Sequence, residues 1–152
     1  MISFNVGTSK FNYRVAGIFI DEKNKRFLTN TAKNIDFVVL PGGRVEIGES
    51  SIESLKREMV EELGANISIV SLKAIIENFF NFDGYDYHEL QYVYVAKFED
   101  ESIQNHTGEF IGIEAKDYSH LAQLQNLEDV EVQTEWIIDT LYEVQETVEL
   151  LS

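Results

Sequence analysis

Three glutamates on one predicted helical turn are the residues of this chain best suited to chemistry. Glu61 and Glu62 follow Glu58 by three and four positions, within a segment of helical hydrophobic spacing. Side chains at these spacings share one face of a helix. Like charges placed in this way repel by about a few tenths of a kcal/mol per pair. A hard divalent cation with oxygen ligands would compensate the repulsion, so the cluster predicts a metal site.

The helix that must position these carboxylates is indicated by an apolar stripe and by signals at both ends. The stripe recurs every three or four residues, as expected for a core-facing side, at Ile52, Leu55, Met59 and Leu63. Ser50 and Glu53 have the spacing of a capping box at the N-terminus. Gly64 lies where a left-handed C-cap glycine belongs.

The segment before this helix reads as a short strand and a turn. The apolar run Asp36 to Leu40 predicts the strand, and Leu40-Pro41-Gly42-Gly43 is expected to stop it in a tight turn. A loop with Glu46 and Glu49 then leads into the acidic helix.

The segment 43–65 resembles the signature of the Nudix hydrolases. That signature is Gly, five residues, Glu, seven residues, Arg-Glu, an apolar residue, one residue, Glu-Glu, one residue, Gly and an apolar residue. The fixed positions are filled here by Gly43, Glu49, Arg57, Glu58, Glu61, Glu62 and Gly64. Ala65 is smaller than the aliphatic residue common at the last position. Seven fixed positions at the correct spacing argue strongly against a chance match.

The resemblance implies a metal-dependent hydrolase that cleaves the diphosphate bridge of a nucleoside diphosphate linked to another moiety. Magnesium is the expected ion, with manganese as a substitute, because such ions favour carboxylate, carbonyl and phosphate oxygens. Glu58 and Glu62 are the expected primary ligands, and Glu61 shares the ion or bridges a second one. The family often adds a backbone carbonyl from the glycine turn, here that of Gly42.

The resemblance also suggests catalytic residues. Arg57 could touch phosphate, but the family pattern favours an orienting pair with Glu49. The general base is either Glu61 within the signature or a glutamate from a later segment. Glu109 and Glu114 are the later candidates, and Glu109 is the better placed of the two.

Two further residues are predicted to contact substrate. Arg44 follows the glycine pair, and Tyr85 lies in an aromatic-rich segment, Phe79 to Asp86, read as a loop. Tyr85 could stack on a nucleobase. Phe79 and Phe80 are instead expected to complete the core.

Composition bounds the class of protein and its partners. A chain of 152 residues, 44% hydrophobic and 26% charged, predicts one globular domain over 1–152. Without cysteine, a secretory leader or an apolar run of about 20 residues, it is expected to be cytoplasmic. The net charge of −15 disfavours a nucleic-acid polymer as partner, and no membrane partner is expected. A small nucleotide can still bind if a metal screens the contact.

The remaining elements complete an α/β prediction. Strands are expected at Phe11 to Ile20, Arg26 to Asn30, Ile67 to Asn78, Tyr87 to Phe98 and near Phe110, with a closing helix over about 130–151. Strands interrupted by two helices favour an α/β/α sandwich with a mixed sheet, the fold that the resemblance also implies. The apolar stripe of the closing helix covers its own sheet or forms a homodimer.

The leading hypothesis is a nucleotide pyrophosphohydrolase whose exact substrate the sequence does not name. The alternative is a non-catalytic nucleotide-binding or sensor module on the same fold, because a fold does not fix function. A third hypothesis is an acidic interaction domain acting through its last helix. Three crowded carboxylates favour the enzyme, since a pure binder gains little from keeping them.

Overall fold

The computed structural model describes residues 1–21, 26–32, 39–100, 109–115 and 119–126. The closing helix predicted over about 130–151 lies outside these ranges, as does most of the strand predicted at Asp36 to Leu40. The described elements follow in the order β1 (Ser3–Val6), β2 (Ser9–Asp21), β3 (Arg26–Ala32), β4 (Gly42–Arg44), α1 (Ser51–Leu63), β5 (Ile67–Phe82), β6 (Tyr85–Phe98), β7 (Glu109–Ala115) and β8 (Ser119–Asn126).

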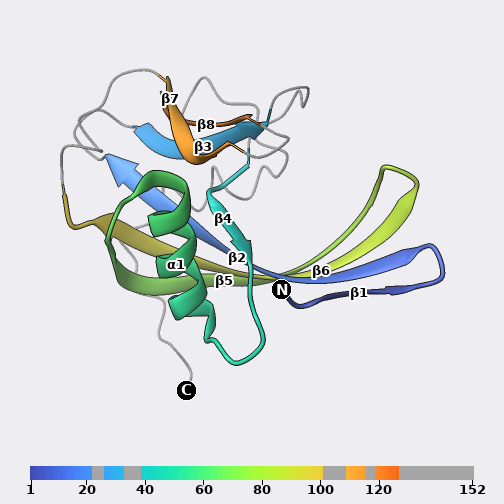
Figure 1. The fold of residues 1–152 in the computed structure, drawn as a ribbon. Helices are drawn as coiled ribbons and strands as arrows, with labels where there is room; N and C mark the ends of the chain where they lie inside the picture. Colours follow the sequence, from blue (N-terminus) through green and yellow to red (C-terminus); the bar gives the residue numbers. More distant parts are fainter. Residues whose placement is uncertain (22–25, 33–38, 101–108, 116–118, 127–152) are drawn as a thin grey trace.

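The strands form a mixed sheet organised around β2 (Figure 1). The strand order is β5-β6-β2-β3-β8-β7, and β1 and β4 pair with β2 off this path. β2 runs parallel to β6, whereas the other paired strands are antiparallel. The helix α1 covers one face of the β5-β6-β2 part of the sheet, and β7 lies beside it. The predicted α/β class with a mixed sheet is therefore confirmed.

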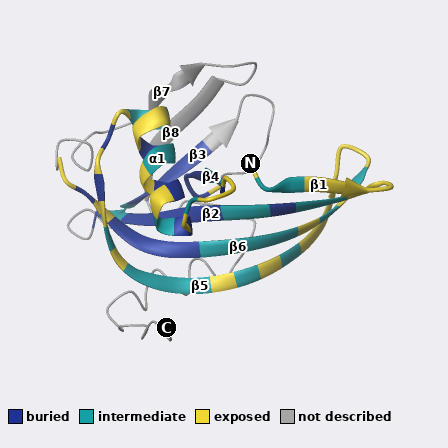
Figure 2. Cartoon of the chain, turned by 60° about the horizontal axis from the view of Figure 1, so that its bottom comes forward, coloured by how far each residue is buried: buried dark blue, intermediate teal, exposed yellow. Residues whose placement is uncertain are grey.

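Two apolar clusters pack on opposite faces of this sheet. On the α1 face, the buried Leu55 and Met59 of the predicted stripe meet Val15, Phe19 and residues of β5 and β6. The cluster on the other face is formed by Ala16, Ile18, Phe27, Leu40 and Val93. Burial is concentrated where α1 covers the sheet, and the tips of the β1–β2 and β5–β6 hairpins are exposed (Figure 2).

Most predicted strands are confirmed, and four of them, β2, β3, β5 and β6, extend beyond their predicted ends. β2, β5 and β6 include the predicted segments at Phe11 to Ile20, Ile67 to Asn78 and Tyr87 to Phe98. β3 returns as the expected hairpin partner of β2, and β7 contains the strand expected near Phe110. β1 and β8 were not predicted from the sequence.

The prediction of a tight turn at the glycine pair is wrong. Gly42 and Gly43 begin the strand β4, which pairs with β2 through Ala16 and Val15. A Cβ atom at Gly42 would collide with the Val15 carbonyl oxygen. The glycine therefore permits close strand pairing here rather than a reversal of the chain.

The prediction of an aromatic loop over Phe79 to Asp86 is also wrong. The strands β5 and β6 continue to a two-residue turn at Asp83 and Gly84, which have φ angles of 51° and 78°. Positive φ at both central residues is typical of the type I′ hairpin turn, for which Asp-Gly is a favoured pair. Phe79 and Phe80 do not complete the core, because they are 70% and 42% exposed.

Within the described ranges, no helix combines the length and the apolar composition that a bilayer crossing requires.

Candidate active site

The acidic helix is fixed at both ends by the caps that the sequence predicted. The Ser50 hydroxyl accepts a hydrogen bond from the Glu53 backbone N–H at 3.1 Å, and the Glu53 carboxylate accepts one from the Ser50 N–H at 2.8 Å. Gly64 adopts the left-handed conformation, with φ 64° and ψ 25°. These caps and the buried stripe set the rotation of α1, so its acidic side is turned toward β4.

Glu58 packs against the glycine strand. A Cβ atom at Gly43 would collide with the Glu58 carboxyl group, so only glycine leaves room for it. The Glu58 side chain is 13% exposed and thus largely enclosed between α1 and β4. The absence of a side chain at Gly43 therefore lets an acidic side chain of α1 lie directly against the backbone of β4.

Arg57 is the centre of the ion-pair network at this site. Its Nη2 and Nε lie 2.8 and 3.1 Å from the two carboxylate oxygens of Glu49, a bidentate pair. Its Nη1 lies 3.0 Å from Glu58 and 3.1 Å from Glu61. Nη2 also donates to the Arg44 carbonyl oxygen at 3.2 Å, which links the helix to β4. The pair with Glu49 expected from the resemblance is present, and its orienting role in catalysis stays a prediction.

This network changes the proton affinity of its members. The hydrogen bonds from Arg57 lower the pKa of Glu49 from 4.5 to about 2, with a further contribution from the Glu46 backbone N–H and against an opposing effect of burial. The hydrogen bond to Glu49, together with the charge of Glu58 and a hydrogen bond to Glu61, raises the pKa of Arg57. Glu49 and Arg57 therefore stay charged across the neutral range.

We expect Glu49 to make folding stability depend on pH in the acid range. Its pKa in the folded protein is about 2, below the unfolded value of 4.5, so its contribution is complete above pH 4.5 and is lost as pH falls toward 2. Urea unfolding of the wild type and of Glu49→Gln at pH 6 and pH 3 measures this. The difference in unfolding free energy should shrink by about 2 kcal/mol at the lower pH. An unchanged difference would contradict the role of the ion pair.

Glu61 and Glu62, the other two signature glutamates of α1, lie toward the end of the helix, where Glu62 contacts β3. The Asn30 amide on β3 donates to the Glu62 carboxylate at 3.3 Å. The Glu61 side chain is 41% exposed and contacts Arg57. No motif in the sequence indicated Asn30, which is one of several polar residues of β3 (RFLTNTA).

The oxygen atoms available at the site are suitable ligands for a hard cation, although the carboxylates are not arranged around a common metal position. In the part of the chain that the structure describes, no group of three or more acidic or histidine side chains is arranged to hold a metal ion. The guanidinium of Arg57 instead contacts Glu58 and Glu61. The available donors are nevertheless carboxylate and carbonyl oxygens, which are the ligands of magnesium and manganese.

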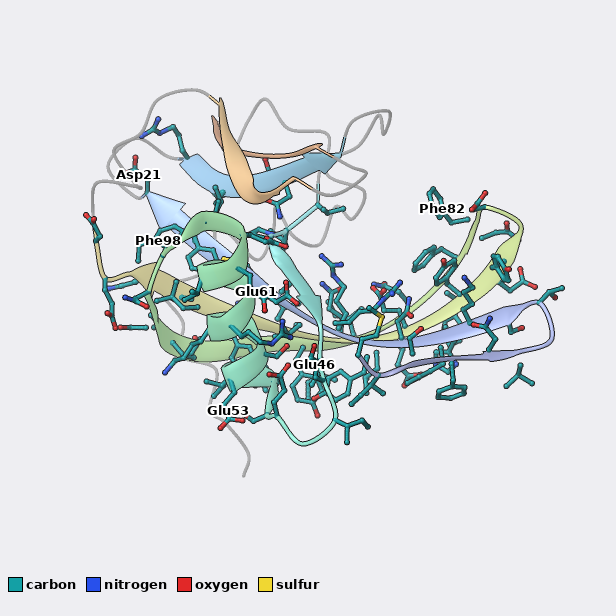
Figure 3. All side chains as sticks on the ribbon, viewed as in Figure 1. Asp21, Glu46, Glu53, Glu61, Phe82 and Phe98 are labelled. Atoms are coloured by element: carbon teal, nitrogen blue, oxygen red, sulfur yellow. The ribbon has the colours of Figure 1, made fainter. Side chains whose placement is uncertain are left out.

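The other predicted site residues divide into two groups. Gly42 and Arg44 belong to β4, beside Glu58 and Arg57. Tyr85 lies at the outer tip of the β5–β6 hairpin, where Lys10 Nζ is 3.9 Å from its ring centroid. Phe82, at the same tip, is well separated from Glu61 and Glu46 beside α1 (Figure 3). The structure therefore does not bring Tyr85 together with the acidic residues.

The two later candidates for the general base belong to one strand. Glu109 is the first residue of β7 and Glu114 lies near its end. The β7 backbone lies beside α1, so this strand borders the acidic helix. The side chains of both residues lie outside what the structure describes, and their catalytic role stays a prediction.

Several known proteins are similar to this chain in sequence or in fold. An 8-oxo-dGTP diphosphatase of Haemophilus influenzae is 38% identical over 71 residues, which cover 45% of this chain and 49% of the relative. The chain thus spans about half the length of this curated relative. A MutT NUDIX hydrolase from Burkholderia pseudomallei superposes with a TM-score of 0.64 at 22% identity, covering 88% of this chain and 98% of the other. An ADP-ribose pyrophosphatase from Streptococcus suis gives a TM-score of 0.63 at 14% identity, covering 91% and 94%.

The two solved structures show that this chain shares their fold. Its membership in a family is shown by a match to a family model. The model of the NUDIX domain matches residues 10–139, which include β2 except its first residue, the glycine strand β4 and the whole acidic helix. The capped helix, the Glu49–Arg57 pair and the glycine contact with Glu58 lie within this match. The chain belongs to the Nudix family.

Proposed function

We propose that this protein is a magnesium-dependent pyrophosphohydrolase that cleaves the diphosphate bridge of a nucleoside diphosphate linked to another moiety. The observation that carries the proposal is the Arg57 network, which holds Glu49, Glu58 and Glu61 in fixed positions beside the glycine strand. A purely solvated acidic helix face would not need an arginine bonded to three carboxylates and to the β4 backbone.

The chain's own residues supply positioning and charge. Hydrolysis joins a water oxygen to one phosphorus and breaks the bond from that phosphorus to the bridging oxygen, which leaves with the departing phosphate. Such reactions depend mainly on alignment and charge neutralisation. Arg57 keeps Glu58 and Glu61 oriented, and Glu61 or Glu109 accepts the proton of the attacking water. Magnesium held by Glu58, Glu62 and the Gly42 carbonyl would stabilise the developing negative charge.

A phosphate-release screen tests this proposal. The panel should include nucleoside triphosphates with 8-oxo-dGTP, nucleotide sugars, ADP-ribose and dinucleoside polyphosphates, each with magnesium, with manganese and with a chelator. We expect release from at least one class of substrate only when a divalent cation is present. Nucleotide binding without release from any compound would instead favour the non-catalytic sensor module.

A further inference from the structure

Two arginines lie side by side on neighbouring strands next to the candidate active site. Arg14 of β2 and Arg44 of β4 are directly opposite in the antiparallel ladder, and both side chains are half-buried. Like charges placed directly opposite across two strands destabilise a sheet. This arrangement opposes folding, so a ligand that neutralises the two charges would relieve the repulsion.

Both arginines lie on the sheet face opposite α1. Their neighbours Val15 and Gly43 face the helix, where Val15 packs with Leu55 and Gly43 faces Glu58. Successive side chains along a strand point to opposite faces, which places Arg14 and Arg44 on the other side. The same face carries Ala16 and Val93 of the second apolar cluster.

A row of polar side chains continues from the arginine pair across the sheet. Gln91 of β6 is the register partner of Arg14. Asn78 of β5 donates to the Gln91 side-chain oxygen at 3.4 Å. The row therefore offers two cationic groups followed by two amides, next to an apolar cluster on the same face.

Neither arginine is neutralised by an acidic residue in the ranges that the structure describes. Arg14 Nη2 lies 3.4 Å from the Leu40 carbonyl oxygen, and Arg44 Nη1 lies 3.0 Å from the Met1 sulfur. The ion pairs found in those ranges involve Arg26, Arg57 and His88 instead. This is notable because the chain has 27 acidic residues and 12 Lys and Arg. Guanidinium groups without a carboxylate partner are well suited to phosphate oxygens.

The arginine pair and the acidic cluster share the strand β4. Arg44 directly follows Gly43, which contacts Glu58, and the Arg44 carbonyl accepts a hydrogen bond from Arg57. Arg14 reaches the Leu40 carbonyl, just before this strand begins. β4 thus has the carboxylates at one face and the arginine pair at the other. A substrate with several phosphate charges that lies along the edge of β4 can be neutralised in part by a cation at the carboxylates and in part by the arginines.

We infer that Arg14 and Arg44 together bind a phosphate group of the nucleotide substrate. The inference rests on the proposed hydrolase function and adds to it Arg14, a substrate-contacting residue that no motif in the sequence indicates. The guanidinium pair supplies charge-assisted hydrogen bonds to the phosphate, and the amides of Gln91 and Asn78 extend the same polar surface.

The inference is tested by steady-state kinetics on the substrate that the phosphate-release screen identifies. Arg14→Gln and Arg44→Gln should each raise KM by about ten- to a hundredfold, the effect of losing one hydrogen bond to a charged group, and change kcat much less. Arg14→Lys should recover part of the affinity, because it restores the charge without the planar fork. Lys97→Gln is the matched control, since it removes one positive charge from an exposed position on β6. An unchanged KM in both arginine variants, or an equal rise in the control, would overturn the inference.

A binding measurement separates this inference from the proposed activity. Calorimetric titration with inorganic pyrophosphate, in chelator and at low salt, should show binding to the wild type and to Lys97→Gln. Binding should weaken at least tenfold in Arg14→Gln/Arg44→Gln. If no substrate is hydrolysed but this pattern holds, the hydrolase proposal fails and the phosphate site stands. Hydrolysis by the wild type, together with equal pyrophosphate binding by wild type and double variant, overturns the phosphate site alone.

Discussion

Replacement of Glu58 or Glu62 by glutamine is expected to reduce phosphate release by about a hundredfold or more. Each change removes one negative ligand from the predicted cation site, where the ion contributes several kcal/mol to charge stabilisation and each 1.4 kcal/mol is about tenfold in rate. Glutamine keeps the shape of the side chain and an oxygen acceptor. The contact from Asn30 to residue 62 can therefore survive, and the helix should stay folded. Initial rates at saturating substrate and magnesium measure the effect.

The control for this experiment is a glutamate of the same charge outside the cluster. Glu77 on β5 is exposed and contacts His88 at the surface, so Glu77→Gln should keep wild-type turnover. Circular dichroism and a thermal melt establish that all variants are folded. Folded Glu58→Gln and Glu62→Gln proteins with near-normal turnover would show that these residues are not ligands of a catalytic ion.

Magnesium is expected to raise the melting temperature through these same residues. A cation that binds the folded site and not the unfolded chain adds RT ln(1 + [L]/Kd), about 2.7 kcal/mol at a hundredfold excess over Kd. For a chain of this size that gain corresponds to a shift of about 5–10 °C. Binding must also displace Arg57 from part of its contact with Glu58 and Glu61, so the measured shift should lie toward the lower end.

A general screening effect of magnesium must be separated from binding at the site. With a net charge of −15, any added salt reduces repulsion among the acidic side chains. The melts therefore compare magnesium with sodium at matched ionic strength, in the wild type and in Glu58→Gln/Glu62→Gln. A magnesium-specific shift in the wild type alone supports the site. Equal shifts in both proteins would indicate only a solvated acidic face.

Local sequence signals determined the acidic helix almost completely. Ser50, Glu53 and Gly64 act within one or two turns of themselves, so the capping box and the left-handed C-cap could be recognised from spacing alone. The buried stripe at Leu55 and Met59 follows in the same way from the helical period. Because these signals also fix the rotation of the helix, the sequence placed Glu58, Glu61 and Glu62 on a common side.

The strands were less completely determined, because their ends depend on pairing partners. The Asp83-Gly84 turn was present in the sequence as a favoured hairpin pair, and recognising it would have converted the supposed aromatic loop into strand. Gly42 and Gly43 carried an ambiguous signal, since glycine serves both tight turns and close backbone approach. Their pairing with β2 makes this segment a strand rather than a tight turn, and no local pattern in the sequence reveals that pairing.

The sequence by itself determined the family signature, the helix that carries it and the residue types that can bind a cation. Only the tertiary structure decided which residues lie together across elements: Asn30 with Glu62, Gly43 with Glu58, and Arg14 with Arg44. Tyr85, predicted from the sequence to stack on a nucleobase of the substrate, lies at the outer tip of the β5–β6 hairpin. The physical reason is that caps and helical periods are set by neighbours along the chain, whereas strand register and long-range packing are set by partners tens of residues away.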